Sequence, residues 1–252
     1  MKAISETIGR QLAHRSVREF TDRAVPEEVL GALFEVMNRT ATSTGLQSYS
    51  VIRVTDAGQR RRVAEVCGQE YVARATELFI FVADAYRNGA IARAKGYDGE
   101  EIRDMDRFFQ GFTDAALAAQ NLTNAVESLG MGAVYFGSIL NDSRAIIEIL
   151  GLPKHTFPVV GVGFGYPAQE PQLKPRMPIS VKVFENRYEL PEDFEETVAA
   201  YDEEMRGYYD TRANGRRSDS FSDQLVARLE NTIDNRAKML RVVREQGFEL
   251  GV

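Results

Sequence analysis

The sequence has 252 residues, of which 44% are hydrophobic and 27% charged, and its formal net charge is -6. This length and composition suffice for one elaborated domain with a substantial core. With a single cysteine, Cys67, and two histidines, an internal disulfide and a metal cage built of histidine and cysteine are excluded. The negative charge disfavours nucleic acid as a partner.

The apolar runs bear on membrane association. None of them approaches the roughly 20 residues that span a bilayer, and the first residues lack the order of a signal peptide. We therefore expect a soluble, cytoplasmic protein that does not associate with a membrane.

The first elements are predicted from apolar periodicity. A helix is expected to open at Pro26, with apolar side chains recurring at i, i+3 and i+4 as far as Met37, and to end near Asn38. Two runs of β-branched and aromatic residues, 51–54 and 78–82, predict strands. The second run is apolar on both faces, which is typical of a central strand.

The middle of the chain predicts a long helix. Apolar residues, many of them alanine, recur at helical spacing from about Asp104 to Leu129, and Gly130 is placed to cap the end. Its many alanines suit close packing against another helix. The elements expected after it are a strand, a helix and two strands, at residues 133–136, 141–150, 157–164 and 179–184.

The character of the sequence changes at Pro191. One helical pattern extends to Met205, a polar stretch covers 210–222, and a last helical region ends near Gly247, with no strand expected. The loose alternation of elements predicts an α+β fold in which a mixed, mainly antiparallel sheet is flanked by helices. We expect one domain over 1–252, with a core at 1–190 and a C-terminal extension at 191–252.

Three alternating glycines, Gly161, Gly163 and Gly165, invite comparison with a dinucleotide-binding loop. That loop requires its glycines between a strand and a helix, whereas these lie inside the expected strand. The favoured interpretation is that small residues allow another group to pack closely on the strand.

Two basic segments suggest an anion. The first holds His14, Arg15, Ser16 and Arg18. The planar guanidinium groups of the arginines and the serine hydroxyl can donate hydrogen bonds to phosphate oxygens. The second is the loop 173–178, in which prolines restrict the backbone that carries its cations, Lys174 and Arg176. Each segment taken alone is also compatible with an ordinary basic surface.

Taken in order, these segments resemble the nitroreductase superfamily, specifically its oxygen-insensitive group A nitroreductases and NADPH:FMN oxidoreductases. The resemblance spans nearly the whole chain. It rests on the segments 14–18, 46–48, 68–69, 127–137, 165–168, 173–176 and 208–212.

The resemblance implies an FMN site between two copies of the chain. Its phosphate would be held by His14, Arg15, Ser16 and Arg18, with Lys174 and Arg176 adding cations. Contacts to the ribityl chain and the isoalloxazine ring would come from Ser43, Gln47, Gln69, Tyr135, Phe136, Gly137 and Ser138. The nitroreductase-like fold would form a homodimer in which the C-terminal helical extension wraps the partner subunit.

The resemblance also implies an activity. NADPH, or NADH, would deliver hydride to N5 of FMN in a ping-pong reaction, and nitroaromatics, quinones or free flavin would then be reduced, with no catalytic side chain required. Arg212 and Arg216 are candidates for binding the 2′-phosphate of NADPH, and a solvated linker is the alternative. The other functions considered are FMN storage or sensing without turnover, and a different flavin reaction on the same fold.

Overall fold

The computed structural model describes residues 4–97, 99–210 and 216–249. The chain forms two compact units. The first comprises residues 1–170 together with 233–252, and the second comprises residues 171–232. The division into core and extension at residue 190 remains a prediction.

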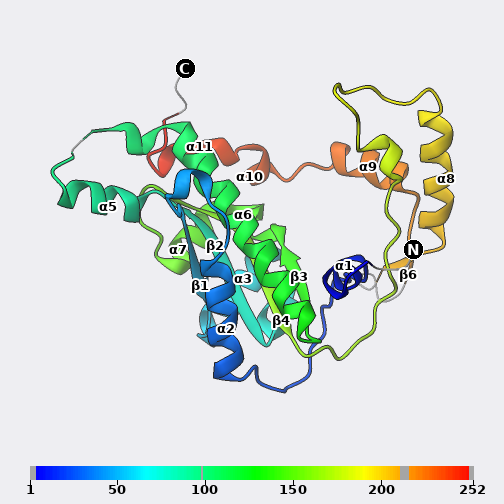
Figure 1. Cartoon of the computed structure of the whole chain (residues 1–252), viewed down its shortest axis with the longest axis horizontal. Helices are drawn as coiled ribbons and strands as arrows, with labels where there is room; N and C mark the ends of the chain where they lie inside the picture. Colours follow the sequence, from blue (N-terminus) through cyan, green and yellow to red (C-terminus); the bar gives the residue numbers. More distant parts are fainter. Residues whose placement is uncertain (1–3, 98, 211–215, 250–252) are drawn as a thin grey trace. The chain divides into compact units, whose positions relative to one another are not determined.

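A four-stranded sheet forms the centre of the first unit (Figure 1). Its order is β1 (Tyr49–Arg53), β2 (Glu77–Asp84), β4 (Thr156–Gly165) and β3 (Gly132–Phe136), and neighbouring strands are antiparallel. Every residue of β2 is buried, which confirms it as a central strand. The predicted α+β class is confirmed. Among the described residues, the only parallel pairing is an isolated bridge from Ser16 to Ala133.

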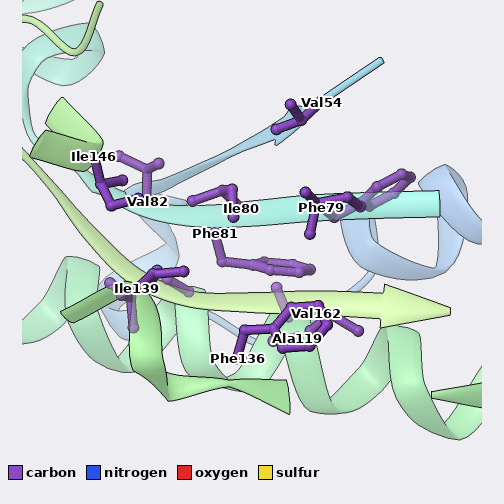
Figure 2. Close-up of a cluster of buried hydrophobic side chains, with 14 of the residues drawn as sticks. Val54, Phe79, Ile80, Phe81, Val82, Ala119, Phe136, Ile139, Ile146 and Val162 are labelled. Atoms are coloured by element: carbon purple, nitrogen blue, oxygen red, sulfur yellow. The ribbon is translucent and has the colours of Figure 1, made fainter. Parts of the chain in front are cut away.

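Two helices predicted from periodicity are confirmed. The helix α2 (Glu27–Asn38) follows Pro26, and α6 (Met105–Ser128) begins where the Asp104 carboxylate accepts a hydrogen bond from the Arg107 amide at 2.8 Å. Ala115, Ala118 and Ala119 of α6 are buried, so this helix packs closely on the sheet. Figure 2 shows part of the core, to which β2 contributes Phe79, Ile80, Phe81 and Val82.

Shorter elements complete the first unit. The helix predicted for residues 141–150 is confirmed as α7, and the Asp142 carboxylate caps it by accepting from the Ala145 amide at 3.1 Å. The helices are α1 (Glu6–Leu12), α3 (Ala57–Cys67), α4 (Tyr71–Arg74), α5 (Tyr86–Ala94), α7 (Ser143–Leu150), α10 (Asp234–Ala237) and α11 (Met239–Glu245). The 3₁₀ turns are η1 (Ser43–Gly45), η2 (Glu101–Arg103) and η3 (Gly137–Asp142).

The alternating glycines lie inside β4, as expected. A Cβ atom built on Gly163 would lie 2.7 Å from Cε2 of Phe136, and one on Gly161 would lie 3.1 Å from the Phe136 Cβ. The glycines therefore make room for the Phe136 ring, and the structural interpretation of the motif is confirmed.

The second unit corrects two predictions. Residues 179–184 form no strand: η4 (Ile179–Val181) follows Pro178, and the Val183 amide donates to the Ile179 carbonyl at 2.9 Å. The β-branched residues of this run lack a neighbouring strand, and a turn satisfies their backbone groups instead.

The expectation of a tail without strands is also wrong. After α8 (Phe194–Arg206), the short strands β5 (Tyr209–Asp210) and β6 (Arg216–Arg217) pair antiparallel, and α9 (Phe221–Glu230) follows. Strands of two residues made of polar side chains carry no apolar alternation, so periodicity gives no sign of them.

Candidate functional site

The basic segment, residues 14–18, is held in place along the edge strand β3. The Val17 amide donates to the Ala133 carbonyl at 3.0 Å, and Ser16 bridges the same residue. A Cβ on Gly132 would lie 2.5 Å from the Val17 Cγ2, so glycine is required for this close approach. The segment is thus fixed by the sheet before any ligand binds.

Two side chains of this segment define its chemistry. Nδ1 of His14 lies 2.5 Å from Oε1 of Glu127, at the end of α6. Nε of Arg15 is buried and has no hydrogen-bond partner among the described residues. Leaving a buried donor unpaired costs about 1–3 kcal/mol, so an acceptor in this place would be bound favourably. The residues present therefore fit a phosphate group.

The predicted ring contacts lie at the other end of β3. The Tyr135 hydroxyl accepts from Thr123 at 2.9 Å and donates to Gln120 at 3.1 Å, and burial raises the pKa of Tyr135. The Phe136 side chain is buried among the β4 glycines, so any contact from this position would come from its backbone. Gly137 follows with an exposed backbone.

Gln69 reaches this end of β3 through Ser138. The α3 helix ends at Gly68, whose φ of 62° lets the chain turn into Gln69. The Ser138 hydroxyl donates to Oε1 of Gln69 at 3.0 Å. Burial raises the pKa of the neighbouring Cys67 thiol to about 11, with a hydrogen bond from Ser138 acting in the opposite direction. The basic segment, the end of β3 and Gln69 thus form one continuous band along the strand.

Ser43 and Gln47 lie elsewhere in the first unit. The Ser43 amide donates to the Asp114 carboxylate at 2.8 Å, near the first third of α6. The basic segment meets the same helix at Glu127. Thirteen residues of α-helix span about 20 Å. Within one chain the structure therefore does not bring Ser43 and Gln47 to the basic segment.

The second unit carries the other predicted cations. Nζ of Lys174 lies 5.8 Å from the centre of the Tyr208 ring, and Nη1 of Arg176 donates to the Lys174 carbonyl at 3.2 Å. The Tyr201 hydroxyl donates to the Pro175 carbonyl at 3.3 Å, which ties this proline loop to α8.

The candidates for NADPH binding are placed only in part. Arg212 lies outside the described residues, and Arg216 is described by its backbone alone, which pairs with Asp210 in the β5–β6 ladder. Their assignment to NADPH stays a prediction.

Three residues of the first unit were not singled out from the sequence. Glu127 pairs with His14, Asp114 holds the Ser43 amide, and Nη1 of Arg236 donates to the Gly137 carbonyl at 2.9 Å. Asp114 carried a signal, since it is an acidic residue within the buried stripe of α6. The other two contacts join positions about a hundred residues apart, and no local pattern marks them.

Two observations bear on other classes of site. Over the described ranges, no group of three or more His, Cys, Asp or Glu side chains is arranged to hold a metal ion. No helix in that part of the chain is long and apolar enough to cross a membrane.

The fold and this band of residues agree with two matches to known families. Residues 12–166 match the nitroreductase family, and residues 174–251 match the nitroreductase family C-terminal domain. The chain belongs to the nitroreductase family.

Individual relatives cover nearly the whole chain. It is 36% identical to the FMN reductase (NADPH) of Bacillus subtilis, over 97% of this chain and 99% of that protein. It is 37% identical to the oxygen-insensitive NADPH nitroreductase of Salmonella typhimurium, again over 97% and 99%. The solved structure of the NADPH:FMN oxidoreductase from Vibrio harveyi complexed with NAD⁺ aligns with a TM-score of 0.83 and 31% identity, covering 96% and 98%.

Proposed function

We propose that this chain is an FMN-dependent NAD(P)H oxidoreductase that accepts electrons from NADPH and reduces nitroaromatics, quinones or free flavin. The observation that carries the proposal is the buried Arg15 Nε, a donor for which the described residues offer no acceptor, in a basic segment fixed on β3. Relatives with the printed names FMN reductase and NADPH nitroreductase support the same activity.

Each group of residues has a role in this proposal. His14, Arg15, Ser16 and Arg18 bind the FMN phosphate, and Lys174 and Arg176 add positive charge. The Gln69 amide and the backbone from Tyr135 to Ser138 supply donors and acceptors that orient the ring. When bound, FMN supplies the hydride chemistry, so the protein contributes position and charge.

The active unit is a homodimer in this proposal. Ser43 and Gln47 lie about 20 Å of helix away from the basic segment, as judged along α6, so a second copy would bring them to the flavin. In the second unit, α9 leaves three apolar side chains exposed, Leu225, Val226 and Leu229, which suits an extension that wraps a partner. A cytoplasmic location remains a prediction.

The test begins with FMN binding. Titration of the purified protein with FMN is expected to reach about one flavin per chain and to give a yellow protein. A protein that stays colourless at saturating FMN would contradict the proposal. Sedimentation of the yellow protein as a monomer would contradict the dimer alone.

The second stage separates turnover from storage. Anaerobic mixing with NADPH is expected to bleach the flavin absorbance, and adding a quinone or a nitroaromatic should restore it. A flavin-storage or sensing protein would bind FMN and keep its absorbance after NADPH is added.

A further inference from the structure

The loop from Thr42 to Ser48, here called the anchored loop, is held by a buried carboxylate. Oδ1 of Asp114 accepts from the Ser43 amide at 2.8 Å, and Oδ2 accepts from the Ser48 amide at 2.9 Å. Asp114 is fully buried on α6. One side chain therefore satisfies a backbone donor at each end of the anchored loop.

The backbone of the anchored loop needs such a restraint. Thr44 and Gln47 have φ values of 50° and 52°, in the left-handed region that side-chain-bearing residues rarely adopt. Residues held in this region persist only where their surroundings fix them, and they concentrate at binding sites. A loop free of Asp114 would relax to other conformations.

Further contacts hold the loop from outside and leave the Leu46 and Gln47 side chains exposed. Nδ2 of Asn88 donates to the Leu46 carbonyl and to Oγ of Ser48, each at 3.0 Å, and Arg87 donates to the Gln47 carbonyl. Leu46 is 44% exposed, and Gln47 is exposed as well. The fixed backbone thus presents side chains outward, as a ligand-contacting loop requires.

We infer that Asp114 is a positioning residue for the flavin: it fixes the anchored loop in the conformation in which Ser43 and Gln47 contact the cofactor. This inference rests on the proposed function. Asp114 touches neither cofactor nor substrate, and it acts by accepting the two amide hydrogen bonds that hold the loop.

The test uses Asp114→Asn, which keeps the size of the side chain. The amide places a donor against one of the two backbone N–H groups, so one anchoring bond is lost. The matched control is Glu77→Gln. Glu77 is a buried carboxylate at the start of β2, whereas the anchored loop contacts the end of that strand at Asp84. Glu77 accepts from Nε and Nη2 of Arg53, each at 2.8 Å. Both variants therefore lose one hydrogen bond to a buried carboxylate.

The first measurement needs no flavin. In the protein freed of FMN, Asp114→Asn should increase hydrogen exchange at the Ser43 and Ser48 amides about tenfold, while Glu77→Gln leaves it unchanged. Unchanged exchange in Asp114→Asn would overturn the anchoring role. Because this measurement uses no flavin, it tests the anchoring role even if the protein never binds FMN.

The second measurement follows the cofactor. Asp114→Asn should raise the FMN dissociation constant about tenfold and shift the visible spectrum of the bound flavin, because contacts to its ring change. Asn88→Ala removes a weaker restraint and should act in the same direction by a smaller factor. It gives an independent reading if Asp114→Asn fails to fold, as judged by circular dichroism.

Three further outcomes would overturn the inference. A loosened loop with unchanged FMN affinity and spectrum would show that the loop conformation does not matter for the flavin. An equal loss of affinity in Glu77→Gln would indicate a general stability effect. A wild-type protein that binds no FMN would overturn the proposed function together with this inference, whereas the first two outcomes leave the proposed function standing.

Discussion

The basic segment and the anchored loop contact the same helix, α6, at Glu127 and Asp114, but they are held in different ways. In the anchored loop, both Asp114 oxygens are satisfied by backbone amides. In the basic segment, β3 fixes the backbone, while the buried Arg15 Nε has no acceptor within the described part of the chain. The anchoring hydrogen bonds of the loop form without a ligand, whereas the Arg15 Nε donor of the segment gains its acceptor when a ligand binds.

The difference separates two contributions to binding. A segment with an unpaired buried donor gains its hydrogen bond only when an anion arrives, so its residues should affect affinity more than stability. A loop that is already ordered contributes by reducing the conformational entropy lost on binding. Substitutions there should affect stability and affinity together.

The largest effect is expected for Arg15→Ala. Loss of a charge-assisted bond to phosphate, worth about 1.5–3 kcal/mol, should weaken FMN binding roughly 10- to 150-fold. The FMN-free protein should be no less stable, because the substitution removes an unpaired buried donor. Lys174→Ala should also weaken FMN binding. Fluorescence titration measures the FMN affinity, and thermal melts measure the stability of the FMN-free protein.

The control for this prediction is Arg61→Ala, at an exposed position on α3. It should change neither FMN affinity nor stability. A large loss of stability in the FMN-free Arg15→Ala protein would contradict the distinction between the two regions.

The next effect is expected for Gly111→Ala, beneath the anchored loop. A Cβ at this position would lie 2.7 Å from the Ser48 carbonyl oxygen, so the backbone of the loop must shift. We expect a loss of about 1–3 kcal/mol in unfolding free energy, together with weaker FMN binding. Denaturant titration and flavin titration of the same sample test whether the two losses occur together.

Gly31→Ala is the matched control for that helix glycine. Gly31 lies in α2, and no atom lies within 4 Å of the position its Cβ would occupy. The same substitution should therefore stabilise the protein, by up to about 1 kcal/mol, because alanine favours helix. Equal destabilisation by both substitutions would show that the effect at Gly111 does not come from the loop.

The sequence predicted the elements whose apolar spacing is regular, and it failed where tertiary contacts decide. The bounds of α2 and α6 and the central position of β2 were predicted, since these elements bury apolar stripes in the core. The run 179–184 has strand-like composition but no neighbouring strand. Composition alone cannot supply that partner.

For the candidate site, too, the sequence predicted local features and missed those that depend on tertiary contacts. The basic segment was predicted because phosphate chemistry depends on residue types that lie close together in sequence. The partners Asp114 and Glu127 were missed. Asp114 lies 71 residues from Ser43, and Glu127 lies 113 residues from His14. Such contacts follow from the fold rather than from a local pattern.

A pH-dependent effect on the free energy of unfolding is expected from Cys67, beside the Ser138–Gln69 contact. Burial raises its pKa to about 11, so the folded protein keeps a proton that the unfolded chain releases near its ordinary value of 9. The stability from this thiol is present below pH 9 and is lost as the pH rises through 11, by roughly 2–3 kcal/mol. Cys67→Ala should flatten this part of the stability profile, measured by denaturant titration. A profile as steep as that of the wild type would contradict the assignment.

The smallest effect is expected in the segment 211–218, where charged side chains would meet the 2′-phosphate of NADPH. From the polar sequence of this segment we expect contacts of the strength of surface ion pairs, about 0.2–1 kcal/mol each, which is less than a buried charge-assisted bond. Arg212→Ala and Arg216→Ala should each raise the KM for NADPH about two- to fivefold, with little change for NADH, which lacks this phosphate. Steady-state rates with both donors give the comparison. Equal losses for both donors would indicate a structural role for the segment. A wild-type enzyme that prefers NADH would remove the hypothesis.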